Sequence, residues 1–201
     1  MIAILDYDAG NIRSVENAFR SLGCETVLSR DPDQIRRADK VVLPGVGVFG
    51  DAMQKLKNYG LEEVVKETAG SGKPFLAICV GLQLLFDSSE ESPGAEGLGI
   101  FPGRIRRIPS TEGLKVPQIG WNSLHIERKS RILNGIDEGA FVYFVHSYYL
   151  ESQEAEPVIA STEYAAHIHA AVERENVFAT QFHPEKSGKV GLRILRNFME
   201  I

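Results

Sequence analysis

The stretch that decides the fold is Phe75-Leu76-Ala77-Ile78-Cys79-Val80-Gly81, an apolar segment that runs into a cysteine. Its first four residues predict a buried strand, and the pattern from Leu82 to Phe86 predicts a helix directly after it. A sharp turn between strand and helix is the context of a nucleophile elbow, where hydrolases place serine. A lone cysteine is more often a small buried hydrophobe. The turn favours a nucleophile, and we expect the helix dipole to favour the Cys79 thiolate.

Strands and helices alternate along the first half of the chain. We expect strands at 2–5, 25–28, 41–43 and 75–78, with helices at about 11–22, up to Leu56, and 61–69. This order predicts a parallel sheet with helices on both faces. In the second half, turn residues separate many short strands, which we expect as antiparallel additions at 98–101, 105–108, 123–126, 142–145, 158–161, 167–172 and 178–182. A helix closes the chain at about 190–199.

The expected fold is therefore α/β: an open, mostly parallel sheet flanked by helices, within a single domain spanning 1–201. In such sheets ligands bind at the carboxyl ends of the strands. Cys79 falls at one of these ends, which makes its surroundings the candidate site.

Composition argues against several classes of protein. The net charge of −5 disfavours non-specific binding to nucleic acid, although Arg104, Arg106 and Arg107 form a local basic patch. The sequence has no apolar run of the roughly 18 residues that a bilayer span needs. Two cysteines give no disulfide framework, so we expect a cytoplasmic setting. His167 and His169 lack a further His or Cys nearby, so we expect no metal and no cofactor.

A thiol nucleophile needs a base, and the base needs a group that orients it. The best candidates are His183 and Glu185, two residues apart at the expected end of a strand, where alternation puts both side chains on one side. An isolated His-Pro-Glu would more often be a surface feature. Together with Cys79, however, the two residues have the chemistry of a catalytic triad.

Pro44-Gly45-Val46-Gly47 follows the third expected strand and offers backbone N–H groups. The longer run 45–50 matches a dinucleotide-binding pattern, but it follows the wrong strand and no acidic residue closes the next one. A plain glycine turn is the commoner use of such a sequence. We expect instead that Gly45, Val46 or Gly47 donates to an oxyanion, with the N–H of Val80 as the second donor.

Together these features resemble the class I, or triad, glutamine amidotransferases, which combine a cysteine elbow, an upstream oxyanion loop and a late His-Pro-Glu. The resemblance covers nearly the whole chain. It implies that Cys79 attacks the side-chain amide of L-glutamine while His183 transfers protons and Glu185 orients His183. It also implies that the substrate is bound by Gln83, Glu91, Ser147 and Tyr148. Ala77 and Val80 depart from the residues usual in the elbow, Gly and Leu.

Finer features resemble the amidotransferase subunits of imidazole glycerol phosphate synthase, from histidine biosynthesis. These features are the segments 6–15, 44–50, 81–86, 120–122, 143–148 and 183–187. This resemblance implies a heterodimer with a (β/α)8-barrel cyclase that consumes the ammonia. Positions that face the partner would be Asn11, Trp121, Tyr143 and Lys186. Composition alone favours core positions for Trp121 and Tyr143.

Three alternatives stay open from the sequence. The chain could serve another synthase, such as one making anthranilate or pyridoxal phosphate, although the 45–50 loop argues against this. It could be a cysteine hydrolase resembling intracellular peptidases. It could also be a flavodoxin-like binding module without activity, which an intact Cys79, His183 and Glu185 disfavours.

Overall fold

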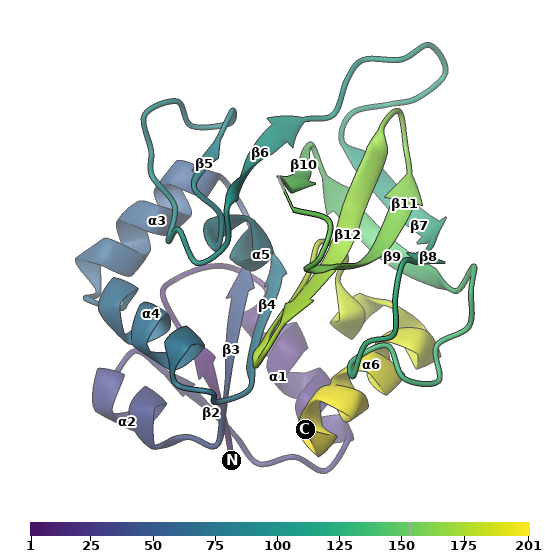
Figure 1. The fold of residues 1–201 in the computed structure, drawn as a ribbon. Coiled ribbons are helices and arrows are strands. Elements are labelled where there is room, and N and C mark those ends of the chain that lie inside the picture. The colour runs from purple at the N-terminus through teal and green to yellow at the C-terminus, as the bar shows by residue number, and fades with distance from the viewer. Residues whose placement is uncertain (153) are drawn as a thin grey trace.

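The centre of the fold is a run of parallel strands in the order β2-β1-β3-β4-β13 (Figure 1). The computed structural model describes residues 1–152 and 154–201. The strands are β1 (Ile2–Leu5), β2 (Thr26–Ser29), β3 (Lys40–Gly45), β4 (Phe75–Cys79) and β13 (Val177–Thr180). Side chains of β1, β4 and β13 are buried on both faces, as expected for parallel strands covered by helices.

Mostly antiparallel strands extend this sheet beyond β13. Strand β13 pairs antiparallel with β12 (His167–Arg174), and the antiparallel order continues through β10 (Tyr148–Ser152) and β6 (Gly103–Arg107). The edge strand β5 (Ser88–Ser89) pairs parallel with β6. Two further strands, β11 (Val158–Glu163) and β8 (His125–Ile126), branch from β12. The predicted α/β sheet with antiparallel additions is thus confirmed. The segment 178–182 is an exception, because β13 runs parallel to β4 and belongs to the central parallel strands.

Two strands form a small separate ribbon. Strands β7 (Gln118–Ser123) and β9 (Phe141–His146) pair antiparallel with each other. We call this pair the β7–β9 ribbon. Its outer face leaves three large apolar side chains exposed, those of Ile119, Trp121 and Phe141.

Helices cover both faces of the parallel strands (Figure 1). They are α1 (Ile12–Ser21), α2 (Pro32–Arg37), α3 (Phe49–Asn58), α4 (Glu62–Gly70), α5 (Val80–Leu84) and α6 (Gly188–Glu200), with a 3-10 turn η1 (Pro184–Lys186) before α6. The Phe198 ring of α6 packs 6.2 Å from Phe19 of α1 and 6.0 Å from Phe178 of β13, measured between ring centroids. Helices α1 and α6 therefore share one face. No helix in the described part of the chain is long and apolar enough to cross a bilayer.

A very close backbone contact lies between β3 and the start of α5. A Cβ added to Gly81 would lie 2.1 Å from the carbonyl oxygen of Leu43, and one added to Gly45 would lie 2.5 Å from the amide nitrogen of Gly81. Real Cβ atoms do not approach backbone so closely. Glycine at both positions is therefore what lets β3 pass directly beside the turn at Cys79.

The segment 98–101 was wrongly predicted as a strand. Its backbone N–H groups instead donate to the end of α5: Leu98 to the carbonyl of Leu84, and Ile100 and Phe101 to that of Leu85. The last carbonyls of a helix have no donor within the helix, and the N–H groups of this segment are the donors for those of α5. Helix α5 also starts and ends two residues before the predicted 82–86.

Several elements were not predicted at all: α2, β5, β7, β10 and η1. Helix α2 did have a local signal, because Pro32 stands at its first position and the Asp31 side chain accepts a hydrogen bond from the N–H of Asp33. Strand β7 had no such signal, since its apolar residues Ile119 and Trp121 face outward.

The basic patch suggested by the sequence is neutralised within the sheet. Arg104 and Arg106 of β6 both bond to the Glu151 carboxylate on neighbouring β10, at 3.1 and 2.8 Å. Arg106 also lies 3.4 Å from Glu90. These two arginines are therefore engaged with acidic neighbours.

A Gly81→Ala variant tests the close contact at the elbow. Since the new Cβ meets the rigid Leu43 carbonyl, we expect a loss of about 2–3 kcal/mol in the free energy of unfolding, as for other overpacked sites. The matched control is Gly70→Ala at the end of α4, where a Cβ meets nothing within 4 Å. Urea unfolding of both variants measures the difference. Equal stability of Gly81→Ala and wild type would contradict the contact.

Candidate functional site

Cys79 occupies the tight turn between β4 and α5 in a conformation that non-glycine residues rarely adopt. Its φ is 56° and its ψ is −112°. Such strain persists when the surroundings force it, here through the contact of β3 with α5. Ala77, the departure from the usual elbow sequence, is fully buried on β4 between Leu43 and Ala179. The turn forms with alanine at that position.

His183 and Glu185 meet beside this turn. The Nδ1 atom of His183 lies 2.7 Å from Oε1 of Glu185, whose side chain is fully buried. The expected reason for their meeting was wrong, however. Strand β13 ends at Thr180, so no strand alternation aligns them; Glu185 instead lies in the 3-10 turn η1.

Strand β9 holds the His183 backbone in place. The N–H of His183 donates to the carbonyl of Tyr143 at 3.0 Å. In return, the N–H of Tyr143 donates to Ser187 Oγ at 3.0 Å, and that hydroxyl donates to the carbonyl of His183 at 2.6 Å. The position of the histidine is therefore tied to the β7–β9 ribbon.

Asn11 also contacts the Glu185 carboxylate. Its Nδ2 atom donates to Oε1 of Glu185 at 2.6 Å. Among the described residues, Glu185 Oε2 and His183 Nε2 are buried without a hydrogen-bond partner. The Glu185 carboxylate fixes Nδ1 of the imidazole, so Nε2 remains available to exchange a proton.

The electrostatic surroundings of His183 favour its charged form. Burial lowers the pKa of His183, but the Cys79 thiol and the Glu185 carboxylate raise it more, giving a pKa of about 10 instead of the ordinary 6.5. An imidazolium beside the sulfur stabilises a thiolate. Because α5 has five residues, its dipole is a smaller source of activation than we expected from the sequence.

A cavity of about 310 Å³ opens over the cysteine. It is lined by Val46, Gly47, Cys79, Val80, Gln83, Glu91, Val145, His146, Ser147, Tyr148, His183 and Lys186. The structure thus brings together ten of the residues singled out from the sequence. Two others lie behind the wall: Gly45 is buried at the end of β3, and Glu185 is buried behind His183.

Two of the lining residues also make contacts that hold the pocket in shape. The Nε2 group of Gln83 donates to the carbonyl of Tyr148 at 3.1 Å. The Glu91 carboxylate accepts a hydrogen bond from the N–H of Phe49 at 2.8 Å, at the start of α3. One Glu91 oxygen is therefore engaged in capping a helix, which limits how much of this carboxylate a ligand can use.

Sequence reasoning missed His146 and Tyr7. His146 Nδ1 lies 2.8 Å from the carbonyl of Tyr148, and burial lowers the pKa of His146 to about 4, so the ring is neutral at pH 7 and its Nδ1–H donates. The buried hydroxyl of Tyr7 donates to the carbonyl of Pro44 at 2.6 Å and anchors the loop 44–47. Both lie in segments used for the resemblance, yet no spacing pattern indicated these contacts.

The residues expected to face a partner occupy different surroundings. Trp121 is 55% exposed on the β7–β9 ribbon, so the core position favoured by composition was wrong for it. Tyr143 is half-buried beside it, with 6.1 Å between the ring centroids. Lys186 is exposed with its Nζ 6.0 Å from the Tyr143 ring centroid, and it also lines the cavity. Asn11 binds Glu185.

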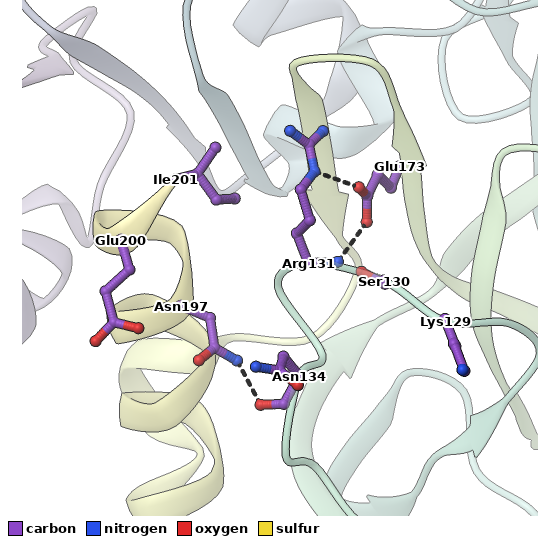
Figure 2. A pocket seen from close by; sticks show the side chains of 8 residues that line it. All are labelled: Lys129, Ser130, Arg131, Asn134, Glu173, Asn197, Glu200 and Ile201. Carbon is purple, nitrogen blue, oxygen red and sulfur yellow. Dashed lines mark hydrogen bonds and ion pairs between the residues drawn. The ribbon is translucent and has the colours of Figure 1, made fainter.

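A second cavity, of about 620 Å³, lies against α6 (Figure 2) and shares no lining residue with the cavity over Cys79. Several of its polar groups are bonded within the protein. Arg131 contacts the Glu173 carboxylate at 2.8 Å, and the Asn197 amide donates to the carbonyls of Ile132 and Asn134. Although this groove is larger, none of its lining residues is a cysteine or a histidine, and the cavity over Cys79 is the candidate active site.

Comparisons with known proteins identify the family of this chain. The sequence model of the family described as glutamine amidotransferase class-I matches residues 3–201. Imidazole glycerol phosphate synthase subunit HisH of Methanothermobacter thermautotrophicus is 52% identical over 201 residues, covering 100% of this chain and 98% of the relative. The subunit HisH of Syntrophotalea carbinolica is 50% identical, covering 98% of each chain.

Solved structures agree on the fold. A crystal structure described as a glutamine amidotransferase superposes with a TM-score of 0.76 at 20% identity, covering 99% of this chain and 97% of that one. PurLQS from Thermotoga maritima gives the same TM-score at 18% identity and the same coverage. The family match and the full-length relatives together decide the identity: this chain belongs to the class I glutamine amidotransferase family, within the HisH subunits of imidazole glycerol phosphate synthase.

Proposed function

We propose that this amidotransferase hydrolyses L-glutamine through a thioester on Cys79 and delivers the ammonia to a (β/α)8-barrel cyclase subunit. The observation that carries the proposal is the meeting of a strained Cys79 with the His183–Glu185 pair at one cavity of about 310 Å³. That volume suits a ligand the size of a single amino acid. Activation of the thiol by a paired imidazolium matches the chemistry of acyl transfer.

In the first half of the reaction, the Cys79 thiolate attacks the side-chain carbonyl carbon of glutamine. The carbonyl oxygen becomes an oxyanion, for which backbone N–H groups of the 44–47 loop and of Val80 are the proposed donors. His183 gives its Nε2 proton to the amide nitrogen as the carbon–nitrogen bond breaks. Ammonia leaves, and a γ-glutamyl thioester remains on Cys79.

In the second half, water replaces ammonia. Neutral His183 takes a proton from water at Nε2, and the resulting hydroxide attacks the thioester carbon. The carbon–sulfur bond breaks, which releases glutamate and restores the thiolate beside the imidazolium. Throughout, Glu185 holds Nδ1 at 2.7 Å and keeps Nε2 directed at the reacting atoms.

The proposed docking surface for the cyclase includes the β7–β9 ribbon. Exposed Ile119, Trp121 and Phe141 give it an apolar face, and aromatic residues are enriched in interfaces. The backbone of Tyr143 on this ribbon is hydrogen-bonded to His183. Docking there would therefore act on the histidine through the backbone of Tyr143, which supports stimulation of the glutaminase by the partner.

The decisive test measures glutamate release by the chain alone, with the cyclase, and with the cyclase and its nucleotide ligand. We expect weak activity alone, stimulation by the complete complex, and loss of activity in Cys79→Ala. The control is Cys24→Ala, which removes the other cysteine and should retain activity. Absence of stimulation, or full activity in Cys79→Ala, would contradict the proposal.

A Glu185→Gln variant tests the orienting carboxylate. We expect the stimulated kcat to fall by about 1,000-fold or more, as for other triads that lose their acid. The substitution removes one cause that raises the pKa of His183, while the lowering effect of burial stays. Wild-type activity, which needs the imidazolium, should persist above pH 6.5 and fall as pH approaches about 10.

In Glu185→Gln, the fall of activity at alkaline pH (the alkaline limb of the pH–rate profile) should occur at a lower pH than in wild type. The measurement is the pH–rate profile of both proteins in the complex. If the limb of Glu185→Gln coincided with that of wild type, the proposed role of the carboxylate would be wrong.

A Trp121→Ala variant tests the docking surface. Because central aromatic residues dominate binding energy at interfaces, we expect the Kd for the cyclase to rise at least about tenfold. Trp121→Phe keeps an aromatic ring and should bind more tightly than the alanine variant. Titration calorimetry gives the constants, and an unchanged Kd for Trp121→Ala would place the interface elsewhere.

A further inference from the structure

Gln181 has a buried amide beside the nucleophile that the mechanism above does not use. It follows β13 directly, and its side chain is fully buried. Its backbone N–H donates to the carbonyl of Ala170 at 2.8 Å, which fixes the position of the residue. A buried amide is costly unless its polar atoms are bonded, so its partners indicate what it does.

Three side chains form a chain of hydrogen bonds from the pocket wall to the sulfur. Gln83 Nε2 donates to the carbonyl of Tyr148 at 3.1 Å and to Oε1 of Gln181 at 3.0 Å. Gln181 Nε2 in turn lies 3.7 Å from the Sγ atom of Cys79 and donates to it. Gln83, Gln181 and Cys79 are all at most 4% exposed.

The direction of every bond in this chain is fixed by the carbonyl of Tyr148. A carbonyl oxygen can only accept, so the Gln83 atom that faces it must be the NH2 group. The same NH2 group faces Gln181, which must present its oxygen there. The NH2 group of Gln181 is then left to face the sulfur, where an N–H donor stabilises a thiolate.

The same order decides what Gln83 offers to a ligand. With its NH2 group engaged twice, its oxygen is the remaining polar atom, and no residue in the described parts of the chain donates to it. Gln83 lines the cavity over Cys79. The pocket therefore presents a hydrogen-bond acceptor at this point and suits a ligand with a donor, such as an ammonium or amide nitrogen.

We propose that Gln181 is a positioning residue that holds the Cys79 thiolate at one end and orients the Gln83 amide toward the substrate at the other. This role rests on the proposed glutamine hydrolysis. It makes Gln181 affect two separate quantities: the reactivity of the thiol, through its NH2 group, and substrate binding, through its oxygen.

Two variants separate these effects. Gln181→Glu keeps an oxygen that accepts from Gln83 but places a carboxylate beside the sulfur. Its kcat should fall at least about tenfold, which is the loss expected when a hydrogen bond to a charged group is removed. Its KM for glutamine should stay within about twofold, because the hydrogen bond to Gln83 is kept. Gln181→Met has a similar shape and neither polar atom. Its kcat should fall and its KM should also rise about tenfold.

Thiol reactivity is measured on the chain alone. Iodoacetamide alkylation of Cys79 at pH 7, followed by peptide mass spectrometry, needs neither cyclase nor glutamine. We expect both Gln181 variants to be alkylated about tenfold more slowly than wild type. Failure of wild type to hydrolyse glutamine with the cyclase would count against the proposed function, whereas equal alkylation of wild type and both variants would overturn the role of Gln181.

The matched control is Asn197→Leu, which removes another buried amide. Asn197 donates to the backbone carbonyls of Ile132 and Asn134. It lines the cavity of Figure 2, which shares no lining residue with the cavity over Cys79. Asn197→Leu should lower stability but leave kcat, KM and alkylation unchanged. If Gln181→Glu does not fold, Gln181→Met decides alone. The proposed orientation of Gln83 would be overturned by an unchanged KM in Gln181→Met. It would also be overturned if the KM of Gln181→Glu rose as much as that of Gln181→Met.

Discussion

The contact between the Leu43 carbonyl and the α-carbon of Gly81 is the constraint on which the site depends. With no side chain at residue 81, α5 starts directly against β3, and the chain must turn within one residue. Cys79 takes that turn at a φ of 56°. The same contact brings Gly45 beside Gly81, so the loop 44–47 begins next to the sulfur. One close packing thus positions both the proposed nucleophile and the proposed oxyanion loop.

Two segments connect this centre to the outer surface. Strand β9 holds the His183 backbone while the β7–β9 ribbon exposes apolar side chains. The loop before α1 holds Glu185 through Asn11, and its Gly10 lies against Val46, where a Cβ would come within 3.1 Å of the valine side chain. A partner that moved either segment would act on the triad or on the oxyanion loop. This arrangement gives the proposed stimulation a physical route.

Much of this could be predicted from local sequence, because the parallel strands and the elbow have strong local patterns. The apolar run 75–78 and Gly81 predicted the turn between strand and helix at Cys79. By contrast, His183 and Glu185 were paired for the wrong reason, since the turn η1 depends on contacts with β9 that lie far away in sequence. The contacts of Gln181 and Tyr7 are also long-range, and the outward apolar face of β7 reverses the pattern that usually indicates a strand.

The central claim is that Cys79 carries the glutamyl group during turnover. The most direct measurement is acid-quench mass spectrometry of the complex with its cyclase while it turns over glutamine. The account predicts a γ-glutamyl adduct on the peptide that contains Cys79, lost when glutamine is exhausted. Turnover without any adduct on that peptide, or with the adduct on the peptide of Cys24, would contradict it.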